Sequence, residues 1–374
     1  MDDTTDATPE PPRYLAKADF DRLFTVLADE GYQVIGPTID QAAIVYAPIR
    51  SIGDLPRGWT DEQAPGTYRL VRRDDEQWFG FVVGPHSWKS FLFPSRATVG
   101  EANKTPDGWQ FRPVQDEPRK QAFLGVRACE IAAMQVQDRV FLNGPYVDPI
   151  YERRRTQALV IAVNCTEAAA TCFCTSMNTG PECRSGYDIA LTELASGFLV
   201  EVGTPEGAAI IAALQTRPAT ADDLAAAGIA RRQAVDQIQR RMNTDGIRDL
   251  LLGNLHHPRW DDVAGRCLSC SNCTMVCPTC FCSSVEEVAD LSGEHVERQR
   301  TWDSCFNIDF SYINGGEVRD QTRSRYRQWL THKLASWLDQ FGTSGCVGCG
   351  RCITWCPVGI DLTEEVAAIR GEST

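Results

Sequence analysis

Two runs of cysteine in the last third of the chain share one spacing. They read CLSCSNCTMVCP from position 267 and CVGCGRCITWCP from position 346. Each is C-x2-C-x2-C-x3-C-P, a ligand spacing for [4Fe–4S] clusters. Three thiolates two residues apart on a tight loop can bind three irons of one cluster, and the fourth, beyond a short helical turn, points toward the other cluster. The spacing therefore predicts two [4Fe–4S] clusters with crossed ligation.

The crossed geometry divides the eight cysteines into two ligand sets. We expect cluster 1 on Cys267, Cys270, Cys273 and Cys356, and cluster 2 on Cys346, Cys349, Cys352 and Cys277. The proline after each run ends the helical turn and directs the chain outward. Pairs of the C-x2-C type also bind zinc, but a zinc site needs only four ligands and leaves the repeated third cysteine and the proline unexplained.

The other eight cysteines contain an internal repeat. Thr-Cys-Phe-Cys occurs at 171–174 and again at 279–282. Free cysteine packs well in cores, yet two thiols one residue apart on an extended segment are better chelators than core fillers. We therefore expect a third metal centre, an iron–sulfur cluster, on Cys165, Cys172 and Cys174 with either Cys129 or Cys183. The C-x-C spacing is tighter than in the usual [4Fe–4S] loop, so the type of this cluster stays open. Whether Cys280, Cys282 and Cys305 are ligands or only pack beside the two clusters stays open.

Composition limits the partners and the compartment. The 374 residues carry a formal net charge of −13, which argues against a nucleic acid or an anionic membrane as partner. The first residues, MDDTTDATPEPP, lack the apolar stretch of a signal peptide, and no apolar run approaches the ~20 residues of a membrane span. We expect reduced thiolates in a cytoplasmic protein.

The elements that position these cysteines form an α+β pattern. Residues 1–12 read as a disordered tail, and apolar residues at helical spacing predict a first helix around Phe20–Leu27. Short β-like runs follow at 33–35, 43–47, 68–71 and 78–83 and suggest a mostly antiparallel region. A strand at 122–126, a helix at 131–140 and a strand at 158–163 then suggest a βαβ unit, which places Cys129 and Cys165 after strand ends.

The second half reads as a different kind of domain. A strand at 198–202, a helix at 205–214 and helices from an N-cap at Thr220 to about residue 255 complete an N-terminal α+β domain, 13–255, with a Cys-rich loop at 164–183. Residues 256–374 read as a mostly α, ferredoxin-like domain for two clusters. A long insert, 279–343, separates its two cysteine runs and carries a basic helix at 322–341.

Several short motifs carry a resemblance to a known family. They are YRL at 68–70, VGPHSWK at 83–89, LGVRACE at 124–130, NC at 164–165, CFC at 172–174, CPTCFC at 277–282, WDSC at 302–305, HK at 332–333 and CGRC at 349–352. Over nearly its whole length the chain resembles the iron–sulfur β subunit of cytosolic NiFe sulfhydrogenases, which is similar in turn to the corresponding iron–sulfur subunit of anaerobic sulfite reductase. Ala128 and Glu130 depart from the Arg-Pro-Cys-Asp that the family tends to have, which puts a special role of that segment in doubt.

The resemblance implies a relay within a larger redox complex. A flavin subunit would handle NAD(P)H, hydrogenase small and large subunits would form the catalytic module, and this chain would pass electrons between them. The residues agree with a subunit that is not catalytic by itself. No G-x-G-x-x-G follows a strand, no phosphate-binding loop is present, and the chain has only five histidines. The alternatives are the corresponding subunit of a sulfite or sulfur reductase, and a binding or scaffold module with structural clusters.

Overall fold

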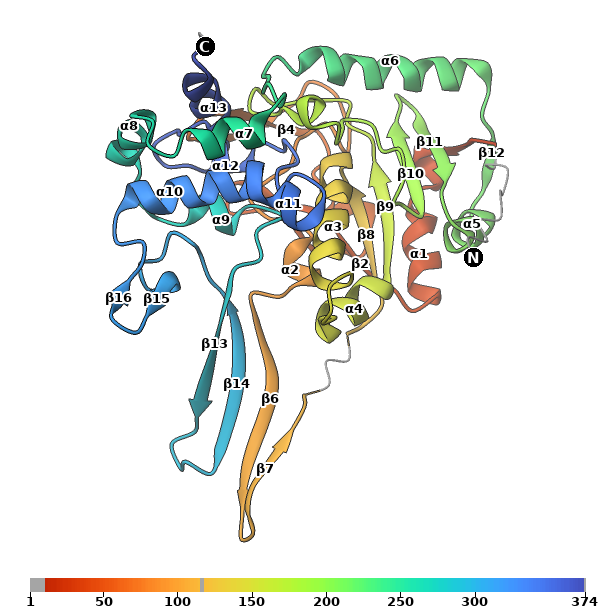
Figure 1. Ribbon diagram of the computed structural model, residues 1–374. Helices are drawn as coiled ribbons and strands as arrows, with labels where there is room; N and C mark the ends of the chain where they lie inside the picture. The colour runs from red at the N-terminus through yellow and green to blue at the C-terminus, as the bar shows by residue number, and fades with distance from the viewer. Residues whose placement is uncertain (1–10, 115–117, 373–374) are drawn as a thin grey trace, which may run out of the picture.

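The computed structural model describes residues 11–114 and 118–372. Residues 1–10 of the expected tail lie outside them. Helices and strands alternate along the chain, which confirms the α+β class (Figure 1). No helix of the described part is long and apolar enough to cross a membrane.

An eight-stranded mixed sheet forms the centre of the first half. Its strand order is β12-β1-β11-β10-β9-β8-β2-β3. The strands are β1 (Arg13–Ala16), β2 (Gln33–Asp40), β3 (Ala43–Pro48), β8 (Gln121–Val126), β9 (Ala158–Val163), β10 (Ile189–Glu193), β11 (Gly197–Val202) and β12 (Thr216–Pro218). β2, β8, β9 and β10 are parallel neighbours, whereas the outer pairings are antiparallel. Of the strands before residue 122, β1, β2 and β3 join this mixed sheet. The expected antiparallel pairing holds there except for β2, which is parallel to β8.

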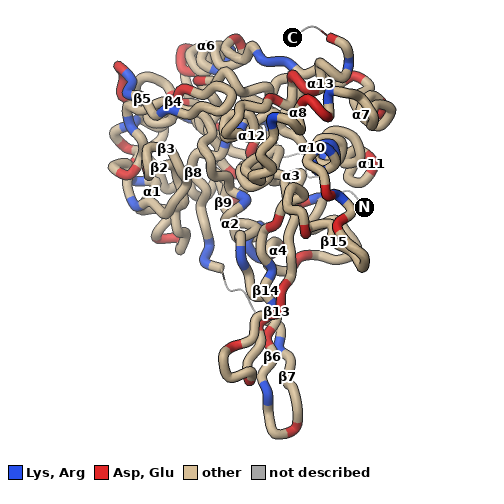
Figure 2. Tube along the Cα trace, turned by 90° about the vertical axis from the view of Figure 1, so that its left-hand side faces the viewer, with Lys and Arg blue, Asp and Glu red and all other residues tan. Residues whose placement is uncertain are grey.

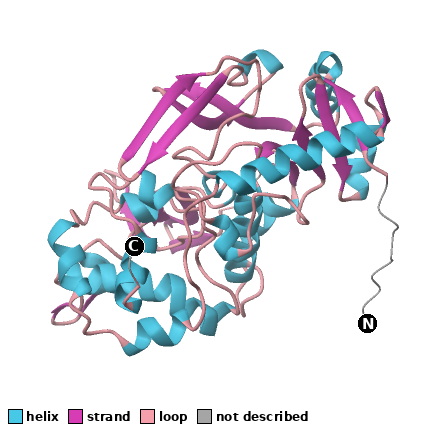
Figure 3. Ribbon diagram, turned by 90° about the horizontal axis from the view of Figure 1, so that it is seen from above, coloured by secondary structure: helices cyan, strands magenta, loops and turns pink. Residues whose placement is uncertain are grey.

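Helices cover both faces of this sheet because its central strands are apolar on both sides. One face packs against α1 (Asp21–Asp29) and α5 (Pro205–Ala212), and the other against α2 (Lys89–Leu92), α3 (Ala128–Phe141) and α4 (Pro149–Thr156). The expected βαβ unit is confirmed as β8, α3 and β9, with β8 and β9 parallel. The long helix α6 (Ala221–Gln237) begins at the expected cap, Thr220, and contacts β10 and β11 (Figures 1 and 3).

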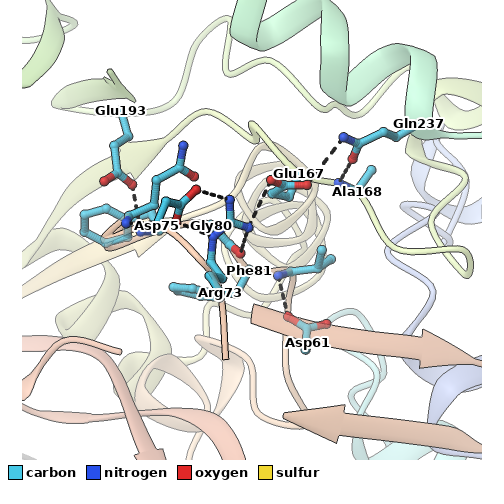
Figure 4. A network of polar contacts seen from close by, with 12 residues as sticks. Asp61, Arg73, Asp75, Gly80, Phe81, Glu167, Ala168, Glu193 and Gln237 are labelled. Carbon is cyan, nitrogen blue, oxygen red and sulfur yellow. Dashed lines mark hydrogen bonds and ion pairs between the residues drawn. The ribbon is translucent and has the colours of Figure 1, made fainter. Parts of the chain in front are cut away.

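The expected strand at 78–83 is wrong. The segment is a buried loop, and charged side chains replace strand neighbours as partners of its backbone (Figure 4). The Glu193 carboxylate accepts from the amides of Trp78 and Phe79, both at 2.8 Å. The Arg127 guanidinium donates to the carbonyls of Phe79 and Phe81, at 2.8 and 3.0 Å. Apolar residues alone could not distinguish this loop from a strand.

A four-stranded sheet projects from the body as an arm (Figures 1 and 2). Its order is β13-β14-β6-β7, so it joins a hairpin of the first half to a hairpin of the insert. The strands are β6 (Arg96–Thr105), β7 (Gly108–Arg112), β13 (Ser283–Ala289) and β14 (His295–Trp302). The insert was expected to lie in a mostly α domain, and this part of it is β structure. A separate hairpin, β4 (Trp59–Ala64) with β5 (Thr67–Arg72), lies elsewhere in the first half.

Short helices surround the two cysteine runs. They are α7 (Ile247–Gly253), α8 (Arg259–Arg266), α9 (Asn272–Met275), α10 (Thr322–Thr331), α11 (Trp337–Phe341), α12 (Arg351–Thr354) and α13 (Leu362–Arg370). A π-helical turn at His332–Ser336 joins α10 to α11, and β15 (Tyr312–Ile313) pairs with β16 (Gly316–Glu317). An apolar core that includes Trp260, Tyr326 and Trp329 packs against several of the cysteines.

Candidate iron–sulfur centres

The first cavity lies where the two cysteine runs meet. Its lining includes Cys267, Cys270, Cys273 and Cys356, three from one run and the last from the other. α8 ends at Arg266, immediately before the first of them, and α9 carries the third. Ser269 and Ser271 have positive φ, at 50° and 67°, and this tight winding brings thiols three residues apart to one cavity. Phe306, Tyr326 and Trp329 form its apolar wall.

The second cavity mirrors the first. Its cysteines are Cys346, Cys349, Cys352 and Cys277, again three from one run and one from the other. Gly348 and Gly350 supply the positive φ, at 64° and 76°. Cys352 also contributes to the first cavity, so the two cavities are neighbours. The structure therefore brings together both ligand sets that the sequence suggested.

The donor chemistry of both cavities fits iron–sulfur clusters. Thiolates bind iron, and both cavities offer at least four cysteines in a largely apolar wall. Burial raises the pKa of Cys273 and Cys352 well above the usual range and that of Cys346 to about 12. Ionising such thiols requires nearby positive charge, which cluster irons supply when bound. Across the described chain, no group of three or more His, Cys, Asp or Glu side chains could hold a single metal ion.

A buried lysine faces the second cavity. Lys333 is 3% exposed and lies in the π-helical turn, a rare geometry that occurs often at functional sites. Its Nζ donates to the Cys277 sulfur at 3.2 Å, to Thr279 Oγ1 at 3.1 Å and to the Gly345 carbonyl at 3.1 Å. The ammonium lowers the pKa of Cys277, although the largest cause is the hydrogen bond from Cys280.

A buried ion pair joins the second cavity to the first half of the chain. Arg351 and Glu130 form a salt bridge, and their side chains are 0% and 1% exposed. Glu130 also accepts hydrogen bonds from Tyr46 at 2.8 Å and from Trp88 at 3.1 Å. Arg351 donates to the Gly84 carbonyl at 2.9 Å. Glu130, where the chain departs from the family pattern, is thus the anionic partner of a cation between two expected ligands of cluster 2.

The cysteines expected to form a third centre gather beside the second cavity. Cys129 begins α3 after β8, Cys165 follows β9, and Cys172 and Cys174 lie in the loop between β9 and β10. Burial is the largest cause that raises their pKa values, and their negative charges act on one another. The charge of Cys349 acts on Cys129, Cys172 and Cys174 as well. This group of four, the third site, adjoins an expected ligand of cluster 2.

Cys183, the alternative fourth ligand, lies further from this group. Its pKa is raised mainly by burial, and Cys165 is the one cysteine whose charge contributes to that shift. Cys183 packs in the apolar core that contains Ala128 and Ile131, whereas Cys129 packs in a separate apolar cluster with the third-site loop. The amide of Cys183 donates to Asn164 Oδ1 at 2.7 Å. The geometry therefore favours Cys129 over Cys183 as the fourth member of the third site.

Polar contacts fasten the loop that carries the third site (Figure 4). The Arg73 guanidinium forms a salt bridge with Glu167 at 3.0 Å and donates a hydrogen bond to the Gly80 carbonyl at 3.1 Å. At the other side Gln237, the last residue of α6, accepts from the Ala168 amide at 2.7 Å. The loop is thus held from the buried 78–83 segment and from α6, between Cys165 and Cys172.

Three cysteines whose role the sequence left open lie at the foot of the β13–β14 hairpin. They are Cys280, Cys282 and Cys305. Cys280 is the largest cause that lowers the pKa of Cys277, and Cys305 is the largest cause that lowers the pKa of Cys282. All three are partly exposed. Both cavities are close to these cysteines. Cys280 neighbours Cys277 of the second cavity, and the charge of Cys273 of the first cavity raises the pKa of Cys305.

Sequence reasoning missed the roles of Lys333, Arg351 and Glu130. Lys333 and Arg351 stood within motifs of the resemblance, at 332–333 and 349–352, but nothing in their spacing indicated burial. One signal could have identified Arg351. It is a basic residue inside a cysteine run, a position where no charge is needed for contact with solvent.

Comparisons with known proteins agree with this geometry. Residues 266–360, which contain both cysteine runs, match the family described as a 4Fe-4S dicluster domain. The chain is also similar to sulfhydrogenase 2 subunit beta of Pyrococcus furiosus. The two are 33% identical over 258 residues, which are 68% of this chain and 75% of the relative. No solved structure matches the chain.

Proposed function

The chain belongs to the family of iron–sulfur β subunits of sulfhydrogenases, as its motifs suggested. We propose that it relays electrons in a cytoplasmic complex, between a flavin subunit that handles NAD(P)H and the small and large subunits of a NiFe hydrogenase. The chain supplies the path and leaves the chemistry of NAD(P)H and hydrogen to those partners.

One observation carries the proposal: two neighbouring cavities, each lined by at least four cysteines drawn from both runs. Cluster 1 is held by Cys267, Cys270, Cys273 and Cys356, and cluster 2 by Cys346, Cys349, Cys352 and Cys277. Each bound cluster accepts and donates one electron at a time. Because Cys352 borders both cavities, bound clusters would be neighbours and could exchange electrons.

The third site extends the path into the first half of the chain. Cys129, Cys165, Cys172 and Cys174 hold a third iron–sulfur centre, next to Cys349 of cluster 2. This arrangement would give a linear order of third centre, cluster 2 and cluster 1. Arg127 supports this assignment, because burial raises the pKa of Cys165 and the nearby positive guanidinium lowers it.

The decisive experiment measures reduction in the assembled complex. The chain is purified anaerobically with its partners, iron and sulfide are counted, and EPR spectra are recorded after addition of NAD(P)H. Reduced cluster signals that appear only when the flavin subunit is present support the relay. Eight irons per chain would exclude the third centre and leave the two-cluster relay intact.

Three outcomes would overturn the proposal. Clusters that resist reduction both by dithionite and by NAD(P)H with the flavin subunit would indicate a structural role. Turnover of NAD(P)H or hydrogen by the isolated chain would show a catalytic site of its own. Co-purification with a sirohaem subunit in place of NiFe subunits would assign the same relay to a sulfite reductase.

A further inference from the structure

Cys282 and Cys305 meet at the foot of the arm, although 22 residues separate them in the sequence. The register of the β13–β14 hairpin explains how. Ser283 pairs with Trp302, so Cys282 lies opposite Asp303, whose amide donates to the Cys282 carbonyl at 2.8 Å. The chain then turns, and Ser304 donates its amide to the Asp303 carboxylate at 2.7 Å. This turn places Cys305 beside Cys282, so that each thiol shifts the pKa of the other.

The two sulfurs have unequal surroundings. Cys305 is the neighbour with the largest effect on the pKa of Cys282, through both its thiol and its backbone amide, and the Lys333 ammonium adds positive charge. The hydrogen bond from the Cys305 thiol is the largest cause that lowers the pKa of Cys282, to about 7. The same contact is the largest cause that raises the pKa of Cys305. One thiolate beside one thiol is the arrangement found in reactive dithiols.

The pair also lies near both clusters of the proposed function. The charge of Cys273, a ligand of cluster 1, acts on Cys305. Cys280 lies two residues before Cys282 and hydrogen-bonds Cys277, a ligand of cluster 2. Both members of the pair are partly exposed, so a proton released on oxidation can reach water.

We infer that Cys282 and Cys305 form a reversible dithiol/disulfide couple that exchanges two electrons with the neighbouring clusters. The Cys282 thiolate and the Cys305 thiol form an S–S bond, the Cys305 proton leaves to water, and two electrons pass one each to oxidised clusters 1 and 2. The reverse step uses two reduced clusters and one proton. The role of the clusters as acceptors rests on the proposed function, whereas the couple itself rests on the two cysteines.

The pair would link two kinds of electron carrier. Each [4Fe–4S] cluster stores one electron, whereas the dithiol stores two. The oxidation state of the dithiol would therefore depend on how many electrons the two clusters hold together. Cys280 would stay outside the couple, as the hydrogen-bond donor to Cys277.

The test traps the couple in the wild-type chain with its clusters in place. Anaerobic protein is poised at a series of potentials with mediators, treated with an alkylating reagent during denaturation, digested and analysed by mass spectrometry. We expect peptides joined through Cys282 and Cys305 to dominate in oxidised samples and to disappear on reduction along a two-electron Nernst curve. Separate alkylation of both sulfurs at every potential, in protein with intact cluster spectra, would overturn the inference.

Variants separate the couple from cluster ligation. Cys282→Ser and Cys305→Ser should each abolish the joined peptide and keep the iron content of the wild type. The control Ser283→Ala alters the adjacent residue, retains both thiols and should keep the joined peptide. A fall in iron in both cysteine variants would show that the pair ligates metal and would refute the couple. Absence of clusters in the wild type would defeat the relay, but the joined peptide would still report on the dithiol.

Discussion

Replacing Lys333 with methionine should lower the reduction potential of cluster 2. Methionine keeps most of the volume and removes the ammonium, which lies 3.2 Å from the Cys277 sulfur. A cluster bound by four thiolates is anionic, and reduction adds one more negative charge to it. The buried cation stabilises that added charge, so its loss makes reduction less favourable. Because Lys333 is fully buried, water does not replace the lost stabilisation.

The size of the shift follows from Coulomb's law. The added electron spreads over the cluster, so we take about 5 Å as its mean distance from Nζ. With an effective dielectric constant of about 20, the interaction is about 3 kcal/mol. A one-electron couple shifts by about 59 mV for each tenfold change in its equilibrium constant, and about 3 kcal/mol corresponds to about 130 mV. Local relaxation reduces this figure, so we expect a shift of about 50 to 150 mV to lower potential.

Potentiometric titration followed by EPR measures the shift, with iron counted in each preparation. Lys333→Arg retains the charge and should stay near the wild type. Arg327→Met makes the same charge change on α10, where the guanidinium donates to the Leu255 carbonyl instead of facing a cluster. An unchanged potential in Lys333→Met with full iron content would refute the electrostatic argument. An equal shift in Arg327→Met would show that the net charge of the protein sets the potential of cluster 2 and that the buried contact of Lys333 does not.

Three further predictions concern ligation, burial and pH. Cys277→Ser should remove or alter the EPR signal of cluster 2 and spare cluster 1; loss of cluster 1 alone would contradict the crossed assignment. Arg351→Met leaves the Glu130 carboxylate buried without its cation and should lower the free energy of unfolding by about 3–5 kcal/mol, measured by urea denaturation with Glu130→Gln as the milder comparison. Burial raises the pKa of Asp61 from 3.8 to about 6, so the folded state binds more protons than the unfolded state at intermediate pH. Stability should therefore rise by at most about 3 kcal/mol as pH falls through 6 toward 4, and Asp61→Asn should flatten that slope.

Local spacing was enough to predict the features that depend on local geometry. The two cysteine runs indicated which thiols could share a cavity, because each loop of about ten residues determines its own shape. The βαβ unit of β8, α3 and β9 was equally legible, since a buried parallel strand is apolar throughout. From that unit alone, Cys129 and Cys165 could be placed at one edge of the sheet.

Other features depended on partners distant in the sequence. The sequence of the 78–83 loop looks like a strand because it is apolar. Its backbone groups hydrogen-bond the charged side chains of Glu193 and Arg127 instead of a neighbouring strand. The arm was missed for the opposite reason. β13 reads SSVEEVA and is exposed along most of its length, so it lacks the alternating pattern of a half-buried strand. Pairing of β14 with β6, nearly 200 residues away, completes that sheet.

The close approach of the two halves explains why glycines occupy the loop of cluster 2. A Cβ on Gly348 would lie 2.6 Å from the Phe173 carbonyl oxygen and 2.7 Å from Cys174 Cα. The Phe173 amide also donates to the Gly348 carbonyl at 2.9 Å. A side chain at this position would have to push Cys172 and Cys174 away from Cys349, in addition to adopting a positive φ. The glycine thus sets the separation between the third site and cluster 2. Since electron transfer weakens with distance, it also determines whether the proposed path continues from one half of the chain to the other.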